Sequence, residues 1–468
     1  MNYTILVNRD NPLKDRYFNY VELVEYENYE KEKIRVEKTT LNAYLKLKDF
    51  LEDNNIFIGI DSAYRDIKEQ EMLIDFYREK YGDAYISNYV APTKESEHHT
   101  GLAIDLSIKV NNKFICDEDE LLENEDIFFN IHKYLYKFGF ILRYPKKKEK
   151  ITGYNYEPWH IRYVGLVPAK IIYENNLSLE EYLCDYSGIL VVNKKKGVTS
   201  RDVVNEVSRI LGIKKIGHTG TLDPLARGVL VLTIGKATKI SELLTATYKE
   251  YEAGVLLGVR TDTRDITGEV IDSKPIRDDI DIEKVLKSYK KTYMQEVPIY
   301  SAVKVAGKKL YEYARGNENV SLPKKKVTIK EIELMSSDRN TFMFKAMVSK
   351  GCYIRSLIDD MGQSMETFAT MTKLTRTKQG KFSIDDAYKI SDIKSNNYKL
   401  LSIEDALDYP VINLSSDLAR KVKNGVRVKN TFSIKDKVIF KYKNELLGIY
   451  QVDDNDDELK TWKNFKTN

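Results

Sequence analysis

One acid in this chain lies where a carboxylate could do covalent chemistry. Asp223 falls within GHTGTLDPLARGVL, residues 217–230, between a glycine-rich turn and an apolar run. A rigid turn backed by a buried strand can hold a carboxylate against a bound ring, where it can act as a nucleophile. An aspartate before proline is more often a turn or cap residue, so the nucleophile hypothesis needs companion residues.

Three further features could complete such a site. Tyr251 opens an apolar stretch and could stack on a nucleobase. Arg355, within GCYIRSL, could pair with Asp223 and keep it ionised. The lysine runs 194–196 and 324–326 could contact phosphate. Each feature also has an ordinary interpretation: a core aromatic, a surface ion pair and two solvated faces.

A second constellation of histidines and acids lies upstream, in SEHHTGLAID (residues 96–105) and EPWH (residues 157–160). A catalytic zinc ion takes three protein ligands and keeps one open position, which His98, Asp105 and His160 would satisfy. Glu157 would then be the base that takes a proton from the zinc-activated water. Judged by the histidines alone, loop positions for His98 and His99 and a packed strand position for His160 are the simpler interpretation.

The two other histidines of the upstream part have no expected role in chemistry. We expect His99 to lie in a surface loop without a ligand role. We expect His132, which falls in an aromatic-rich helical stretch, to be structural.

The bulk composition fits a multidomain globular protein. The chain has 468 residues, of which 42% are apolar and 31% charged. A net charge of +4 permits a nucleic-acid partner without requiring one. Three scattered cysteines, none in a CxxC pair, argue against a disulfide framework or a cysteine-zinc site. The N-terminal residues do not resemble a signal peptide and no stretch approaches a membrane span, so we expect a cytoplasmic protein.

The order of expected helices and strands begins a new pattern near residue 186. Because both parts mix helices and strands, we expect an α+β multidomain protein. The first part mixes helices and strands, and the part from Gly188 begins a fresh pattern that ends in a hairpin-like segment near 438–450. The expected helices are 41–51, 69–81, 126–138, one from Ser178 and 200–211, and the expected strands are 57–60, 101–108, 189–194, 228–234 and 251–258. We predict three domains: a small α+β domain over 1–186, a mixed α/β domain over 187–408, and a small β-rich appendix over 409–468.

The upstream motifs resemble the D-alanyl-D-alanine carboxypeptidases of the VanY type. S-x-H-x-x-G-x-A-x-D matches residues 96–105, and SAYR (62–65) and TGYNYEPWHIRYVG (152–165) match further motifs. The resemblance covers roughly residues 1–184. It implies zinc held by His98, Asp105 and His160, Glu157 as the base, and peptide contacts from Arg65, Gln70 and Ser96, with Arg65 pairing the terminal carboxylate.

The downstream motifs resemble the TruB-type tRNA pseudouridine synthases, which isomerise uridine 55 of the T loop. GILVVNKKKGVTS, GHTGTLDPLARGVL, PIYSAVKVAGKKLYEYAR and SKGCYIRSLIDDMG match in order and spacing between residues 187 and 385. The resemblance implies a reaction without metal or organic cofactor. It makes Asp223 the nucleophile, Tyr251 the stacking residue and Arg355 its orienting partner, with His218 and Leu374 shaping the RNA side of the pocket.

Some positions depart from the TruB pattern. Lys195 replaces a common proline, Cys352 stands at a threonine-like position, and Thr375 stands where an arginine is common. The loss of a positive charge at Thr375 could weaken RNA affinity without stopping the chemistry.

The resemblances together predict a fusion of a tRNA pseudouridine synthase with a zinc D,D-carboxypeptidase. The expected partners are the tRNA T stem-loop and a D-Ala-D-Ala-terminated peptide, and we expect a monomer. Two alternatives stay open: an N-terminal domain that is an inactive or binding module, and a fusion that is an artefact of the gene model.

Overall fold

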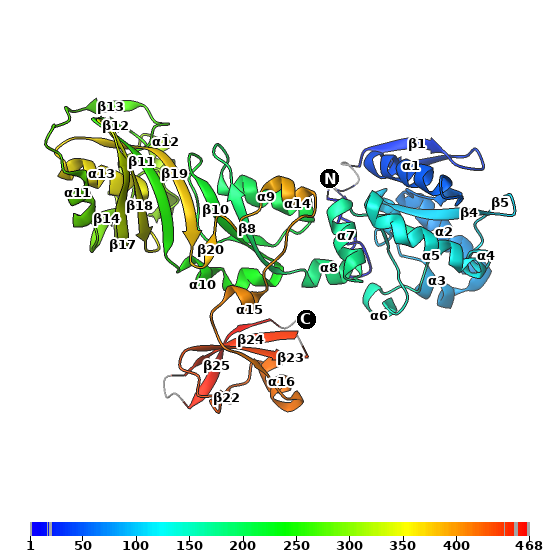
Figure 1. Cartoon of the computed structure of the whole chain (residues 1–468). Coiled ribbons are helices and arrows are strands. Elements are labelled where there is room, and N and C mark those ends of the chain that lie inside the picture. Colours follow the sequence, from blue (N-terminus) through cyan, green and yellow to red (C-terminus); the bar gives the residue numbers. More distant parts are fainter. Residues whose placement is uncertain (1, 16, 18–20, 444, 454–456, 466–468) are drawn as a thin grey trace. The chain divides into compact units, whose positions relative to one another are not determined.

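The computed structural model describes residues 2–15, 17, 21–443, 445–453 and 457–465, and the chain divides into two compact units (Figure 1). The first unit comprises Met1–Tyr186 with Ser208–Lys214 and Lys394–Asn396. The second comprises Ser187–Val207, Lys215–Ile393 and Asn397–Asn468. No helix in the described part of the chain has both the length and the apolar character that a membrane crossing requires.

The first unit is built on a five-stranded antiparallel sheet. Its strand order is β3 (Ile58–Ser62), β4 (Ala103–Val110), β7 (His160–Tyr163) and β6 (Phe140–Leu142), with β5 (Lys113–Ile115) paired to β4. Helices α1 (Lys38–Glu52) and α5 (Glu125–Leu135) contribute apolar residues at helical spacing to a core that they share with these strands. A separate hairpin joins β1 (Leu23–Glu27) to β2 (Lys33–Glu37).

Local signals explain where several helices of this unit begin and end. Helix α2 (Ile67–Tyr81) starts at a capping box formed by Asp66 and Glu69, and it ends at Gly82. Helix α8 (Leu179–Asp185) starts at Ser178, as the sequence predicts, where Ser178 and Glu181 form a capping box. The other helical segments are α3 (Asp83–Tyr89), η2 (Glu97–Thr100), α4 (Glu118–Glu123), η3 (Tyr136–Phe138), α6 (Glu149–Thr152) and α7 (Leu166–Glu174).

The second unit is built on a nine-stranded sheet. Its main path runs β14 (Thr292–Glu296), β17 (Lys324–Ser337), β18 (Thr341–Val348), β11 (Lys249–Leu257), β19 (Ala369–Gln379), β10 (Arg227–Ile234) and β8 (Gly188–Lys194), with β20 (Phe382–Ser383) on β19 and β9 (Ile216–His218) on β10. The β10–β19 pair is parallel, and Gly228 faces Arg376 in its register. A Cβ at Gly228 would collide with the backbone oxygen of Arg376, so this close approach requires glycine.

Further helices and short strand pairs complete the sheet region of the second unit. The paired strands are β12 (Val259–Thr261) with β13 (Val270–Ser273) and β15 (Lys304–Val305) with β16 (Lys308–Lys309). The helical segments are α9 (Ser200–Leu211), η4 (Gly235–Ile240), α10 (Ser241–Thr245), α11 (Ile282–Ser288), α12 (Leu310–Arg315), α13 (Ile354–Ser364), α14 (Ile390–Lys394) and α15 (Ile403–Ala406).

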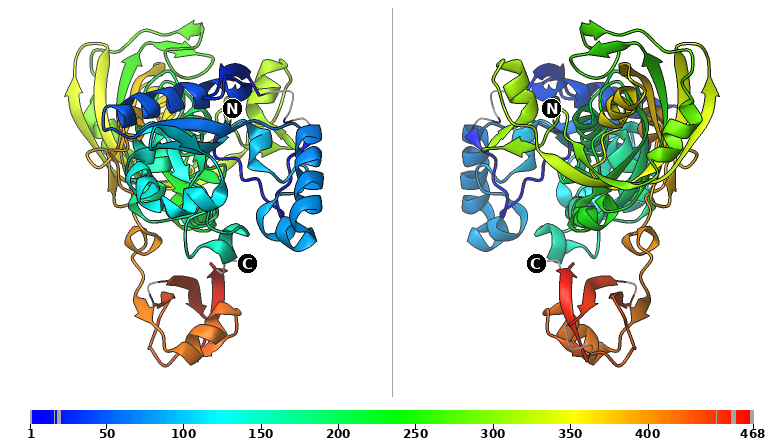
Figure 2. Two further views of the ribbon diagram at one scale, coloured as in Figure 1. Left: turned by 90° about the vertical axis from the view of Figure 1, so that its right-hand side faces the viewer. Right: turned by 90° about the vertical axis from the view of Figure 1, so that its left-hand side faces the viewer.

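The C-terminal residues form the β-rich region that the sequence predicts, coloured orange to red in Figure 2. Five strands lie in the order β21 (Val411–Asn413), β23 (Lys437–Tyr442), β24 (Glu445–Val452), β25 (Glu458–Asn464) and β22 (Val428–Lys429). β23 and β24 form the antiparallel hairpin expected near 438–450. Helix α16 (Ser416–Lys423) packs Ala419 and Val422 into the same apolar cluster as these strands.

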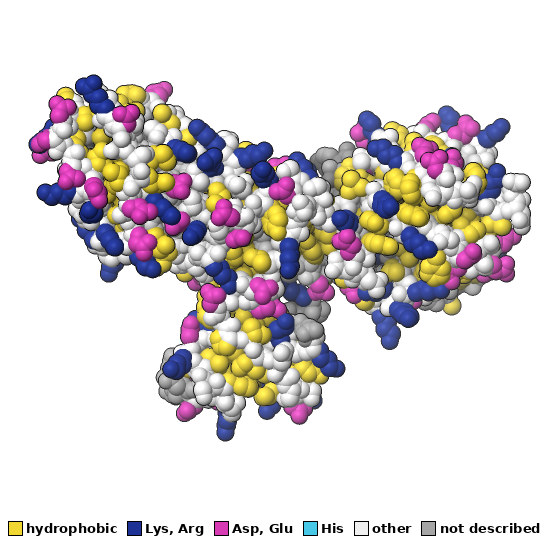
Figure 3. All heavy atoms as spheres, viewed as in Figure 1, with side chains coloured by type: hydrophobic (Ala, Val, Ile, Leu, Met, Phe, Trp, Pro, Cys, Tyr) yellow, Lys and Arg dark blue, Asp and Glu magenta, His cyan; other side chains and the backbone are white. Residues whose placement is uncertain are grey.

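The three lysines at residues 194–196 are not all available to bind phosphate. Lys194 is 1% exposed, and its ammonium donates hydrogen bonds to the carbonyl oxygens of Lys195, Val198 and Ala226. The expectation that Lys194 contacts phosphate is therefore wrong, because its three donors are already used inside the fold. Lysine and arginine side chains elsewhere are interspersed with acidic ones on the face shown in Figure 3.

Replacing Lys194 by alanine should lower the free energy of unfolding by about 2–4 kcal/mol, because three carbonyl groups lose their donor and a cavity opens. Chemical denaturation followed by circular dichroism measures this change. Lys195→Ala is the matched control, since Lys195 is exposed, and it should change the free energy by less than about 0.5 kcal/mol. Equal effects of the two substitutions would contradict this account of Lys194.

Candidate active sites

The upstream site is assembled by two paired strands and the turn before one of them. Asp105 on β4 lies opposite His160 on β7, and His98 lies on η2, the 3₁₀ turn before β4. The Asp105 carboxylate contacts both rings, with His98 Nε2 at 3.1 Å from Oδ2 and His160 Nδ1 at 2.9 Å from Oδ1. One ligand atom from each of the three residues lies within 4.8 Å of the others, as shared metal binding requires.

The surroundings of the two rings suit metal ligation. His98 Nδ1 lies 2.6 Å from the carbonyl oxygen of Ala63, to which it can donate, leaving the Nε2 lone pair for a metal. Burial lowers the pKa of His98 to about 4, so this ring is neutral near pH 7. Burial also disfavours the charged form of His160, but Asp105 beside it outweighs that effect and raises the pKa of His160 to about 9. Asp105 thus stabilises a positive charge on His160, whereas His98 stays neutral.

All seven residues predicted for the upstream site line one cavity of about 230 Å³: Arg65, Gln70, Ser96, His98, Asp105, Glu157 and His160. The Glu157 carboxylate lies 3.6 Å from His160 Nδ1, and burial raises the pKa of Glu157 to about 8. Gln70 is buried and donates through Nε2 to the carbonyl of Ala91 at 2.8 Å. Ser96 Oγ accepts a hydrogen bond from the backbone N–H of His98. A carboxylate with a raised pKa beside a metal-ligand set can exchange protons near neutral pH.

The expectation for His99 is wrong, because this residue is buried rather than placed in a surface loop. Its exposed fraction is 0%, and its Nδ1 lies 2.7 Å from the carbonyl oxygen of Arg65. The turn η2 faces inward, so both of its histidines are enclosed. His132 Nε2 lies 2.9 Å from the carbonyl oxygen of Pro158, which agrees with its expected structural role.

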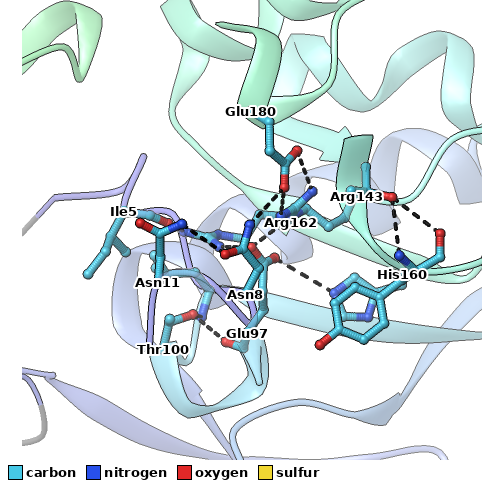
Figure 4. Close-up of polar contacts among 12 residues, drawn as sticks. Ile5, Asn8, Asn11, Glu97, Thr100, Arg143, His160, Arg162 and Glu180 are labelled. Carbon is cyan, nitrogen blue, oxygen red and sulfur yellow. Dashed lines mark hydrogen bonds and ion pairs between the residues drawn. The ribbon is translucent and has the colours of Figure 1, made fainter. Parts of the chain in front are cut away.

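The sequence did not single out a buried ionic cluster beside the candidate metal ligands. Figure 4 shows Glu97 between Arg143 and Arg162, with His160 and Glu180 nearby. Glu97 lies inside the SEHH motif, whereas Arg162 lies on β7 and Arg143 directly follows β6. Arg162 lies two residues after the proposed ligand His160, on the short strand HIRY, and this spacing is the clue that could have identified the cluster.

The downstream site centres on an ion pair between Asp223 and Arg355. Asp223 lies in the turn between β9 and β10, and Arg355 in the first turn of α13. Arg355 Nε donates to Asp223 Oδ2 at 2.8 Å, and Nη2 donates to Oδ1 at 3.1 Å, which is the two-point geometry of an oriented carboxylate. The same guanidinium donates to the carbonyls of Thr263 and Tyr300, so it is fixed from both sides.

Tyr251 and Leu374 lie with Asp223 and Arg355 around a cavity of about 240 Å³. The Tyr251 hydroxyl accepts a 3.4 Å hydrogen bond from Arg376, a buried residue that also donates to the carbonyls of Val229 and Gly220. Arg376 thus connects β10 and β11 to the turn that carries Gly220 and Asp223. The sequence did not reveal this role. Its contacts fix Tyr251 beside the Asp223 loop.

Two other predicted residues lie outside this cavity. His218 lies on β9 and does not line the cavity. Thr375 is buried and its hydroxyl accepts a hydrogen bond from Arg227 Nε, so the position is enclosed by protein contacts. The roles proposed for these residues toward RNA stay predictions.

Comparison with known proteins assigns the downstream unit. The family model "TruB family pseudouridylate synthase (N terminal domain)" matches residues 208–354. The tRNA pseudouridine synthase B of Bacillus licheniformis is 44% identical over 255 residues, which cover 51% of this chain and 82% of that protein. That of Bacillus subtilis is 42% identical over 254 residues, covering 51% and 82%. The chain belongs to the TruB family.

The upstream part of this TruB-family chain matches a second family. The model "D-alanyl-D-alanine carboxypeptidase", called VanY, matches residues 33–166. A crystal structure of a vancomycin-resistance D,D-pentapeptidase VanY in complex with Zn(II) is 31% identical, covers 39% of this chain and 99% of that one, and has a TM-score of 0.35. The two family models and the tRNA pseudouridine synthase B relatives show a fusion of a VanY-type domain with a TruB-type synthase.

Proposed function

We propose that the downstream unit isomerises uridine 55 in the T loop of tRNA to pseudouridine. The observation that carries this proposal is the two-point ion pair between Asp223 and Arg355 beside Tyr251 in one cavity. The relatives named tRNA pseudouridine synthase B support the choice of substrate. No metal or organic cofactor is needed for this reaction, since the isomerisation only exchanges a C–N bond for a C–C bond.

The cavity residues suit each step of this reaction. The target uridine leaves the T loop at a cost of a few kcal/mol, which stacking on Tyr251 and contacts with Leu374 offset. Asp223 attacks the base or, in an alternative course, the ribose, and the bond between ribose C1′ and N1 breaks. The uracil turns, C5 bonds to C1′, and the bond to Asp223 breaks, which frees the carboxylate. The C5 proton leaves, with Tyr251 placed to assist, and N1 takes up a proton. Arg355 keeps Asp223 oriented and ionised throughout.

A second activity, zinc-dependent D,D-carboxypeptidase, is proposed for the upstream unit. The specific observation that favours it is the clustering of His98, Asp105 and His160 with Glu157 in one cavity. Two imidazoles and a carboxylate are a usual ligand set for catalytic zinc, and the ligand atoms here are close enough to share one ion. Zinc bound there would supply the Lewis acidity that activates water for peptide hydrolysis.

The chain's own residues then bind the peptide and move protons. The guanidinium of Arg65 lines the cavity and can pair with the terminal carboxylate of a D-Ala-D-Ala peptide. Gln70 and Ser96 supply further polar contacts to the peptide. Glu157 accepts a proton at its carboxylate as water attacks, and returns it to the leaving amine. The intact ligand set favours this activity over the alternative of an inactive or binding module.

Substituting Asp223 by asparagine should lower pseudouridine formation in a T-loop stem-loop RNA by at least about 1,000-fold, because the amide is not a nucleophile. Single-turnover kinetics with the full chain measure the rate. Asp278→Asn changes an exposed aspartate of the same unit and should leave the rate unchanged. Activity retained in the Asp223 variant would rule out the synthase assignment.

Substituting Glu157 by glutamine should lower release of D-Ala from a D-Ala-D-Ala peptide by about 100- to 10,000-fold, because the proton acceptor is lost. Zinc content should stay at the wild-type level, since Glu157 is not one of the three ligands. Glu79→Gln, at an exposed position of α2, is the control that should keep full activity. Zinc-loaded wild-type protein that releases no D-Ala would contradict the proposed peptidase activity.

A further inference from the structure

One buried carboxylate next to the proposed metal site has no part in the reaction described above. Glu97 is 1% exposed, and its Oε1 forms ion pairs with Arg143 Nε at 2.7 Å and Arg162 Nη1 at 2.6 Å. Both arginines are fully buried, as Figure 4 illustrates. Two guanidinium groups on a single oxygen leave the other oxygen of Glu97 available for a different partner.

That second oxygen faces a zinc-ligand candidate. Glu97 Oε2 has no hydrogen bond among the described residues, and it lies 3.9 Å from His160 Nε2. His160 Nε2 is likewise buried without a hydrogen bond in the described part of the chain. The opposite edge of the same ring contacts Asp105 through Nδ1. A buried donor and a buried acceptor that face each other in this way complete each other's hydrogen bonding after a small shift.

We propose that Glu97 is a positioning residue that accepts the Nε2–H of His160 and thereby directs the His160 Nδ1 lone pair at the metal. The inference rests on the metal site proposed above and adds a residue that the ligand set does not include. Carboxylates that hold the distal N–H of a ligating imidazole fix both its tautomer and its ring orientation, and they raise its basicity.

The rest of the cluster keeps Glu97 charged and in place. Arg143 and Arg162 both contact Glu97 Oε1, so two guanidinium groups compensate the charge of this buried carboxylate. Arg143 also pairs with Glu180 of α8, through bonds of 2.7 and 3.1 Å. Arg162 donates to the carbonyls of Tyr3 and Ile5 in the N-terminal segment. Two carboxylates thus balance two guanidinium groups, and residues before and after the VanY-matched segment support a ligand inside it.

A purely structural role for Glu97 would be to neutralise the two buried arginines. Glu180 has that role toward Arg143 but does not reach His160, so it provides a matched control. Glu97→Gln replaces one carboxylate oxygen by an N–H₂ group, which must face either the arginines or the His160 N–H, all of them donors. In both orientations the imidazole loses its charged acceptor. In Glu180→Gln the contact between Glu97 and His160 is left intact.

The test is the zinc dissociation constant of the full chain, measured by competition with a chromophoric chelator. Glu97→Gln should weaken zinc binding by about 10- to 100-fold, whereas Glu180→Gln should stay within about threefold of wild type. Both variants should lower the thermal midpoint. Wild-type affinity in a folded Glu97→Gln protein, or equal losses in the two variants, would overturn the proposal.

A second measurement needs no variant and covers the case in which Glu97→Gln fails to fold. Two-bond ¹⁵N–¹H correlation spectra of the zinc-loaded wild-type protein report the tautomer of each histidine. His160 should carry its proton on Nε2, and a proton on Nδ1 would overturn the proposal. Wild-type protein that binds no zinc would instead overturn the proposed metal site itself, so the two failures can be distinguished.

Discussion

Ion pairs between arginine and a carboxylate fix the acids of both candidate sites of the chain. Asp223 is compensated by the two-point contact of Arg355, and Glu97 by Arg143 and Arg162. Removing one partner of a fully buried pair, such as those of Glu97, typically costs about 3–5 kcal/mol, because the remaining charge is left uncompensated. The arginines therefore do more than add stability: they fix where each carboxylate points, and the chemistry depends on that direction.

The two sheets provide the rigidity that these pairs require. In the first unit the antiparallel pairing of β4 with β7 places Asp105 opposite His160, so two of the three proposed ligands are fixed by backbone hydrogen bonds. In the second unit the register of β10 with β19 brings Arg376 beneath the Asp223 turn and against Tyr251. Strands from distant parts of the sequence thus position each site: β4 and β7 carry Asp105 and His160, while His98 and Asp223 lie in turns that adjoin strands.

Much of this organisation was predictable from the sequence, and the failures have physical causes. The cap residue Ser178, the apolar strands and the motif residues are local signals, and they predicted α8, β10, the upstream cavity residues and four residues of the downstream cavity, but His218 lies outside the latter. Lys194 and His99 were misjudged because polarity alone suggests exposure, whereas both side chains are buried against backbone carbonyl oxygens. Arg143, Arg162 and Arg376 were not singled out because their partners lie far away in sequence, and only the fold brings them together.

The central claim is that one chain carries two chemically independent sites, of which only the upstream one uses a metal. Both activities should be measured on a single preparation of the full chain before and after treatment with a zinc-selective chelator. D-Ala release should fall to background and return when zinc is added back, while the rate of pseudouridine formation stays unchanged. A parallel loss of pseudouridine formation, or D-Ala release that persists in the zinc-free protein, would contradict the account.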